Sequence, residues 1–464
     1  MNLPVVWSLL LAAVLLTTGC NKDDDDDGPA PVTQGSLQVV NAIIDSQLVT
    51  FRIKTSSSED FNPLDQLQFR QASQLALAPA DDYDVEITYL DPLTNETIEL
   101  LPDFQFTLTA EMVYTFILHG DFTNPQTMLL EKPRGDLDTG DAAEFEAQIV
   151  HVGTGEALDV YLGDPNATID TSAPLTTLIP GASTQPLLRT AGLQRLRLTE
   201  AGDSQVLYDS GTFNLVGRTR RTFLLHDNVG PDANTKDTVL LTESGTIEHP
   251  NEVARAGFRV FNAVPDETSI TVDLIDATSE QTLETVTLGF TEVTDFAPIT
   301  ATFIDVSVAA ASAPGVEANR TTVSLNQDTF YTLTVGGSIP DDSLSVRSST
   351  SPQRPIATFA NLHFVNTLRE TDDPEIPRVD LYALEVGDAL DDDVPRFVQF
   401  GFLASAAAIV PPMLMDLVVT TSGTNAILVG PVRVDMVARS SIIVVATEAT
   451  GGGEPYQIIV ETTQ

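Results

Sequence analysis

Residues 256–275 read Ala-Gly-Phe-Arg-Val-Phe-Asn-Ala-Val-Pro-Asp-Glu-Thr-Ser-Ile-Thr-Val-Asp-Leu-Ile, and a recognisable version of this stretch occurs four times in the 464-residue chain. Equivalent points in the four copies are 110, 111 and 104 residues apart; they are Asn41, His151, Asn262 and Asn366. This period is too long for a solenoid repeat and matches the size of one small β-sandwich domain. The repeat therefore predicts four tandem domains.

Two further strands recur in the same order in every copy. The first reads Val-Asp-Leu at residues 272–274, where the period of two buries one face and turns the polar residue outward. The second reads Tyr-Thr-Phe-Ile-Leu-His at residues 114–119, a run of β-branched and aromatic residues with few polar ones. Such a run is typical of a central strand that is covered on both faces.

These patterns predict an all-β protein with four tandem immunoglobulin-like β-sandwich modules after a signal peptide and a disordered acidic tether. Because the segments between modules are short, we expect neighbouring modules to form a semi-rigid rod. The predicted boundaries are 1–19 for the signal peptide, 20–35 for the lipidated cysteine and tether, and 36–131, 143–247, 254–347 and 356–464 for the modules, the last of which is divergent.

The charge and cysteine content exclude several classes of function. The formal net charge is −43, and such a surface repels nucleic acid and anionic lipid. Cys20 is the only cysteine, so no disulfide can form within the chain and no cysteine-based metal site is available. Each sandwich must therefore be stable through packing alone, and we expect no metal or other cofactor.

The N-terminal segment predicts a lipid anchor. Residues 5–16 form an apolar run too short to span a bilayer, followed by Thr-Thr-Gly-Cys at 17–20, which resembles the cleavage site of a bacterial lipoprotein. Thr17 stands where leucine is usual, and residues 1–4 contain no Lys or Arg. By this resemblance Cys20 carries the lipid and residues 22–34, with five consecutive aspartates, form the tether. The expected location is the cell envelope, in the outer membrane, at the periplasmic face or at the cell surface.

The repeated motifs also resemble a known family. Ile-Val-His-Val at 149–152 with Leu-Asp-Val-Tyr at 158–161, and Asn-Ala-Val-Pro-Asp at 262–266 with Val-Asp-Leu at 272–274, are similar to the signature of the domain of unknown function 4397 family. Module 4 keeps Asn-Thr at 366–367 and Val-Asp-Leu-Tyr at 379–382, and module 1 keeps only Asn-Ala at 41–42. The resemblance implies tandem β-sandwich modules on secreted or lipid-anchored bacterial proteins, and it implies no activity.

A catalytic site is not favoured by the sequence. Asp138-Thr-Gly and Asp209-Ser-Gly look like the paired loops of aspartic proteases, in which two close carboxylates share one proton. The first triplet lies in an acidic linker, the pair does not occupy matched places in two lobes, and Asp-x-Gly is a common turn sequence. His119, His151, His226 and His363 stand where sister modules carry Gly, Ala, Asn or Phe, which indicates core or strand-end histidines.

Three repeated aspartates are the remaining candidates for a binding surface. Asp159, Asp273 and Asp380 occupy one equivalent position, where outward carboxylates could bind calcium or a sugar, or discourage strand pairing at an edge. We predict a non-catalytic, lipid-anchored protein with a structural, adhesive or scaffold role, whose partners are the membrane and envelope proteins or glycans. The alternative is a lipoprotein that binds a glycan or peptide through loops of module 4, and a hydrolase that uses Asp209 or a histidine is a distant third.

Overall fold

A computed structural model describes residues 33–135, 141–169, 172–232, 235–300, 302–369, 378–390 and 393–463. The described residues form an all-β structure without α-helices, in which the strands build four two-sheet sandwiches in succession. The predicted fold class is therefore confirmed. No helix within these ranges is long and apolar enough to cross a membrane. Cys20 and the aspartate run lie outside the described residues.

Each module uses eight or nine strands. The strands of module 1 are β1 (Gln34–Asn41), β2 (Val49–Thr55), β3 (Asn62–Leu67), β4 (Gln71–Ala72), β5 (Ala76–Pro79), β6 (Asp81–Leu90), β7 (Thr97–Leu108), β8 (Met112–Asp121) and β9 (Asn124–Pro133). Those of module 2 are β10 (Glu144–His151), β11 (Leu158–Gly163), β12 (Thr176–Leu178), β13 (Leu187–Thr190), β14 (Gly192–Glu200), β15 (Val206–Leu215), β16 (Arg220–Asp227), β17 (Lys236–Thr242) and β18 (Gly245–Glu248).

Modules 3 and 4 repeat this order. The strands of module 3 are β19 (Ala256–Ala263), β20 (Ser269–Asp276), β21 (Thr282–Gly289), β22 (Ala297–Ile299), β23 (Phe303–Ala310), β24 (Glu317–Ser324), β25 (Phe330–Gly336) and β26 (Ser345–Thr350). Those of module 4 are β27 (Ala360–Asn366), β28 (Val379–Glu385), β29 (Phe397–Phe400), β30 (Ser405–Val410), β31 (Leu414–Thr421), β32 (Ile427–Asp435), β33 (Ser441–Thr447) and β34 (Gln457–Thr463).

The strand order within a module is the same in all four. One sheet contains the first strand, as in β22-β19-β25-β26, and we call it the first-strand sheet. The other contains the second strand, as in β21-β20-β23-β24, and we call it the second-strand sheet. The first strand runs parallel to the long apolar strand near the end of its module, whereas the other pairs are antiparallel. The two recurrent apolar runs of the sequence are therefore neighbours in space.

The asparagine of the repeated motif joins the two sheets of its module. The Asn262 side chain accepts a hydrogen bond from the Val264 backbone N–H (2.9 Å) and donates one to the Leu288 carbonyl at the end of β21 (3.1 Å). Asn41 and Asn366 make the same pair of contacts in modules 1 and 4. Each of these side chains is fully buried, so both of its polar groups need a partner. The recurrence of this asparagine is therefore explained by its structural role of joining the two sheets of a module.

Residues on the first-strand sheets alternate between two different cores. In β8, Phe116 and Leu118 face the interior of module 1, whereas Ile117 belongs to a separate cluster that also contains Val150 and Leu224 of module 2. The first-strand sheets of modules 1 and 2 therefore pack face to face. The prediction that these strands are covered on both faces is confirmed, and the second cover is a sister module. A two-layer sandwich can cover only one face of each sheet by itself.

Modules 3 and 4 pack in the same way. Phe261 from β19 shares a cluster with Val365, Ile443 and Val445 from module 4. Arg259 lies on the same face of β19, only 3% exposed, with its guanidinium over the Phe296 ring (4.5 Å to the centroid). Burial lowers the pKa of Arg259 to about 10. The two face-to-face pairs thus use equivalent surfaces.

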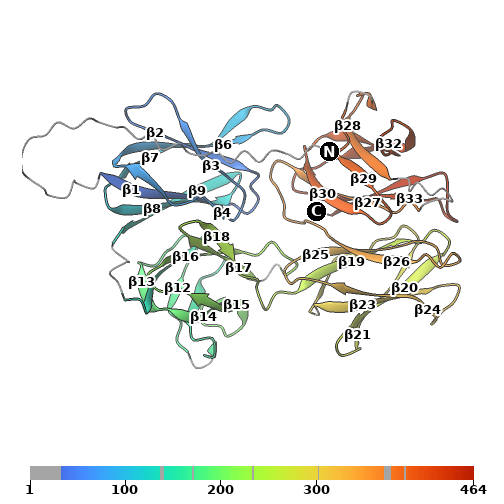
Figure 1. Ribbon diagram of the computed structural model, residues 1–464, viewed down its shortest axis with the longest axis horizontal. Coiled ribbons are helices and arrows are strands. Elements are labelled where there is room, and N and C mark those ends of the chain that lie inside the picture. The colour runs from blue at the N-terminus through green and yellow to red at the C-terminus, as the bar shows by residue number, and fades with distance from the viewer. Residues whose placement is uncertain are drawn as a thin grey trace, which may run out of the picture.

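Polar contacts join the two pairs, so the predicted rod is wrong. Between modules 2 and 3, the Asn228 side-chain amide donates to Asp328 (2.6 Å). Between modules 4 and 1, Arg439 donates to Asp45 (2.6 Å), and Arg354 donates to the carbonyls of Ile44 and Ser46. Each module contacts two others, and Figure 1 shows the four at the corners of a square. A rod would leave the apolar outer faces of the first-strand sheets in water, and this cost favours the closed arrangement.

Candidate functional site

The three repeated aspartates accept hydrogen bonds from within their own modules, and they differ in how far their side chains are exposed. Asp159 is 6% exposed and accepts hydrogen bonds from the Thr177 hydroxyl (2.5 Å) and the Gly202 backbone N–H (2.8 Å). Asp380 is 4% exposed and accepts from the backbone N–H groups of Gln399 and Gly423.

Asp273, the third of these aspartates, is more open, and its carboxylate accepts from the Thr285 hydroxyl (2.5 Å). The expectation of three outward, solvated carboxylates is therefore wrong for Asp159 and Asp380. Neither residue belongs to the apolar cluster of its module, and each carboxylate accepts from a backbone N–H of a hairpin turn, that of Gly202 after β14 and that of Gly423 after β31.

Asp209 lies in a β-bulge and is bound by an arginine. In the pairing of β14 with β15, Arg195 faces Thr212 and Arg197 faces Asp209, so β15 carries one extra residue. Gly211 supplies the positive φ (61°) at this bulge. Both oxygens of Asp209 accept from the Arg195 guanidinium at 2.6 Å. The Asp-Ser-Gly triplet is thus a bulge inside a strand, and Asp138 lies outside the described residues.

The four histidines singled out in the sequence are buried in the cores or between modules. His151 is fully buried in β10, and burial lowers its pKa to about 4. His226 packs edge-on against Phe69 of module 1 (5.5 Å between ring centroids), and burial lowers its pKa to about 3. His363 lies within hydrogen-bond distance of the Ser349 and Ser351 hydroxyls, and burial lowers its pKa to about 4. His119 is 7% exposed, and burial lowers its pKa as well.

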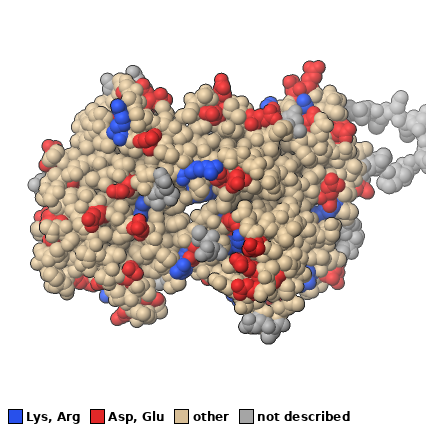
Figure 2. Space-filling model, turned by 180° about the vertical axis from the view of Figure 1, so that it is seen from behind, with Lys and Arg blue, Asp and Glu red and all other residues tan. Residues whose placement is uncertain are grey.

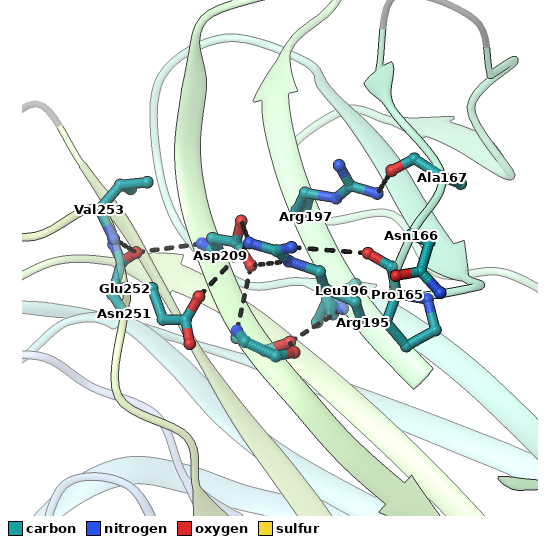
Figure 3. A network of polar contacts seen from close by, with 12 residues as sticks. Pro165, Asn166, Ala167, Arg195, Leu196, Arg197, Asp209, Asn251, Glu252 and Val253 are labelled. Atoms are coloured by element: carbon teal, nitrogen blue, oxygen red, sulfur yellow. Dashed lines mark hydrogen bonds and ion pairs between the residues drawn. The ribbon is translucent and has the colours of Figure 1, made fainter. Parts of the chain in front are cut away.

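The described residues hold one site that the sequence reasoning missed, a hollow lined by arginines on module 2. Arg195 and Arg197 project from β14 in the second-strand sheet, and Arg189 reaches over from β13 in the first-strand sheet. Arg189 donates to the Leu162 carbonyl within β11 (3.1 Å). Arg195 and Arg197 donate to carbonyls of the segment after β11, those of Pro165 (3.5 Å) and Ala167 (2.5 Å). Figure 3 shows Arg195 and Arg197 on either side of Leu196, both directed toward this segment.

Two adjoining depressions make up this feature, which we call the arginine hollow. The larger encloses about 600 Å³, and its polar lining includes Asn166, Thr190, Gln194 and Thr212. The smaller, about 280 Å³, is lined by Tyr161 and by all three arginines. The two share Gly163, Asp164 and Arg189, so one carboxylate lines both depressions.

The three guanidinium groups differ in how they are neutralised. Arg195 is held by Asp209 and lies 3.3 Å from Glu252, and the hydrogen bond to Asp209 raises the pKa of Arg195. Arg189 and Arg197 donate to carbonyl oxygens, and the Nε atom of each is buried without a hydrogen-bond partner in the described part of the chain. The hollow therefore holds two guanidinium groups that form no ion pair in the described part of the chain, in a protein of net charge −43.

Residues of the linker to module 3 form hydrogen bonds with Asp209, the partner of Arg195. The Asn251 side chain accepts from the Asp209 backbone N–H (3.0 Å) and donates to the carbonyls of Leu207 and Lys236. The Glu252 backbone N–H donates to the Asp209 carbonyl (2.7 Å). Figure 3 shows these linker residues beside Asp209, on the side opposite Pro165 and Asn166. The position of Arg195 is thus fixed by β15 and the linker together.

The comparisons with known proteins assign the chain to no family. No family model matches the chain, and no curated protein matches it. Among solved structures, the Bacillus anthracis TIE protein aligns over 86% of this chain and 68% of its own, with 7% identity and a TM-score of 0.16. The full-length RrgB pilus protein from Streptococcus pneumoniae aligns over 77% and 73%, with 11% identity and a TM-score of 0.11. At these TM-scores the alignments carry no argument about function.

Proposed function

We propose that the chain is a non-catalytic protein of the bacterial cell envelope, anchored by lipid on Cys20, in which four β-sandwich modules form one block with a structural or adhesive role. The repeated signatures also support membership of the domain of unknown function 4397 family as part of this proposal. The observation that carries the proposal is the closed set of contacts among the four modules.

The closed arrangement gives the block a defined set of outer surfaces. Because the first-strand sheets pack against each other, the second-strand sheets of each pair face away from one another. Figure 1 shows those of modules 1 and 4 along one side of the block and those of modules 2 and 3 along the other. Figure 2 shows acidic side chains spread over one face, which favours a well-solvated particle. Such a block is suited to holding surfaces in fixed positions at the end of a tether.

The residues that suggested chemistry have structural partners instead. Asp209 is neutralised by Arg195, and His151 is buried with a lowered pKa. A general base must be able to reach the proton that it removes, and neither group meets this requirement. These contacts support the non-catalytic proposal.

Two experiments test the proposal. The Cys20→Ala variant should leave the membrane fraction and appear in the soluble fraction; continued membrane retention would contradict the anchor. In cells that depend on this protein for surface attachment, Arg354→Ala combined with Arg439→Ala should open the contact between modules 4 and 1 and impair attachment. Arg433→Ala is the matched control, because Arg433 pairs with Asp416 on the outer sheet of module 4. Turnover of generic peptidase or glycosidase substrates that is lost in Asp209→Ala would instead support a hydrolase.

A second function, ligand binding by this envelope protein, is favoured by the arginine hollow. The sequence placed the binding loops in module 4, where residues 370–377 lie outside the described part. Arg369, which precedes that segment, is held by Glu448 (2.7 Å). The hollow on module 2 is the better-defined candidate, since two of its three guanidinium groups form no ion pair among the described residues.

A further inference from the structure

We propose that the arginine hollow binds a sugar residue that bears a carboxylate, a uronic acid within a glycan of the cell envelope or its surroundings. This inference deepens the ligand-binding function above and rests on it. The carboxylate would lie in the smaller depression against Arg189 and Arg197, and the rest of the sugar would lie in the larger depression.

The chemistry of the smaller depression fits a carboxylate. A guanidinium carries five N–H donors in a planar fork that matches the two oxygens of a carboxylate. Arg189 and Arg197 each donate one hydrogen bond to a carbonyl oxygen, and neither forms an ion pair in the described part of the chain. The Nε atom of each is buried, so a carboxylate would be bound by the terminal Nη groups. Both side chains are half-buried and each is held by a carbonyl oxygen, so the groups are partly desolvated and already positioned. An anion at this place would gain charge-assisted hydrogen bonds with little ordering of side chains.

The larger depression fits a sugar better than a peptide. The side chains of Asn166, Thr190 and Thr212 are exposed there, and they can exchange hydrogen bonds with ring hydroxyls. Its large apolar residue, Leu193, is 62% exposed and forms no enclosed pocket for the side chain of a peptide anchor. Tyr161 in the smaller depression offers an aromatic face for the apolar side of a sugar ring.

The net charge limits the ligand to few carboxylates. A polyanion would approach a protein of charge −43 against long-range repulsion, whereas a glycan with occasional uronic acids would meet little of it. A second depression, at the junction of modules 1 and 2, is lined by Arg218 and Arg221 together with the carboxylate of Glu243. Asp164 likewise lines both depressions of the arginine hollow. The smaller depression of the hollow nevertheless has three arginines, and Arg189 and Arg197 form no ion pair among the described residues, so their charge remains available to an anion.

The test is titration calorimetry of the full-length chain in detergent with a matched pair of disaccharides. One contains glucuronic acid linked to N-acetylglucosamine, and the other has glucose in place of the glucuronic acid, so the two differ in the carboxylate alone. We expect saturable binding of the acidic disaccharide and binding at least tenfold weaker for the neutral one. Arg197→Gln and Arg189→Gln should each weaken the acidic disaccharide roughly tenfold to a hundredfold, the range of a lost charged hydrogen bond.

Two further variants separate binding from folding. Thr212→Val removes an exposed hydroxyl of the larger depression without touching an arginine, and should weaken binding severalfold at an unchanged unfolding midpoint. Arg433→Gln removes an arginine of β32, on the second-strand sheet of module 4, and should leave binding unchanged. Equal binding of the two disaccharides, full binding by both arginine variants, or preferential binding of a short peptide with a free C-terminal carboxylate would each overturn the inference. Membrane release of Cys20→Ala is independent of these outcomes, so failure here and failure of the anchored-block proposal are distinguishable.

Discussion

Replacing Ile117 by alanine tests whether the modules depend on one another. Ile117 is fully buried in β8, but it belongs to the cluster between modules 1 and 2 and not to the core of module 1. In an isolated module 1 the same side chain would lie on an open sheet face. The variant therefore removes packing that exists only if the two modules are joined.

The two arrangements predict different costs for this change. Truncating a fully buried isoleucine to alanine costs about 2–5 kcal/mol, from lost transfer free energy and the cavity left behind. Truncating an exposed aliphatic side chain costs within about 0.5 kcal/mol. Leu77→Ala is the matched control, because Leu77 is on β5 of the same sheet and is 54% exposed.

Urea unfolding followed by intrinsic fluorescence and circular dichroism measures both costs. We expect Ile117→Ala to lower the free energy of unfolding by more than about 2 kcal/mol, and Leu77→Ala to change it little. A double-mutant cycle with Leu224→Ala in module 2 should show a coupling of about 0.5–3 kcal/mol. Equal small effects of Ile117→Ala and Leu77→Ala, with additivity in the cycle, would refute the face-to-face packing.

The remaining predictions concern single contacts. Asp159→Ala and Asp380→Ala should each cost about 1–3 kcal/mol in urea unfolding because a buried backbone N–H loses its acceptor, while Asp273→Ala costs less than about 1 kcal/mol; three equal values would contradict the burial described above. The folded-state pKa of His363 is about 4 and its ordinary value is 6.5, so the unfolded chain binds the extra proton between these pH values. Stability should therefore decrease as pH falls from about 6.5 to 4, and His363→Gln should show a shallower decrease in urea midpoint than the parent. Arg439→Ala should speed amide hydrogen exchange at the contact between modules 4 and 1 and leave exchange in the core of module 2 unchanged; uniform exchange in both places would count against the closed arrangement.

Much of the fold could be predicted from the sequence because period-two patterns report directly on burial. The run at 114–119 indicated a strand covered on both faces, and Phe116, Ile117 and Leu118 are all fully buried. The pattern does not say what provides each cover. Ile117 could have been covered by a third layer of its own module, and only the arrangement of the modules shows that module 2 covers it.

The polar sites were less predictable because their partners come from distant segments. Asp159 reads as an outward strand residue, and its burial depends on Gly202, 43 residues later. Asp209 reads as part of a turn until its pairing with β14 reveals the extra residue of a bulge. The alternation Arg195-Leu196-Arg197 was a usable signal for two cations on one face of a strand. Arg189 comes from the other sheet, so the hollow itself could not be inferred from spacing.

Small-angle X-ray scattering of the chain from residue 21 onward tests the central claim most directly. A compact body of this length has a radius of gyration of about 22 Å, somewhat more for a flat four-module block, whereas four such modules in line would give about 40 Å. The closed arrangement predicts a value below about 28 Å, with the acidic tether adding about 20 Å to the largest dimension. A radius of gyration near 40 Å with the profile of an elongated particle would contradict it.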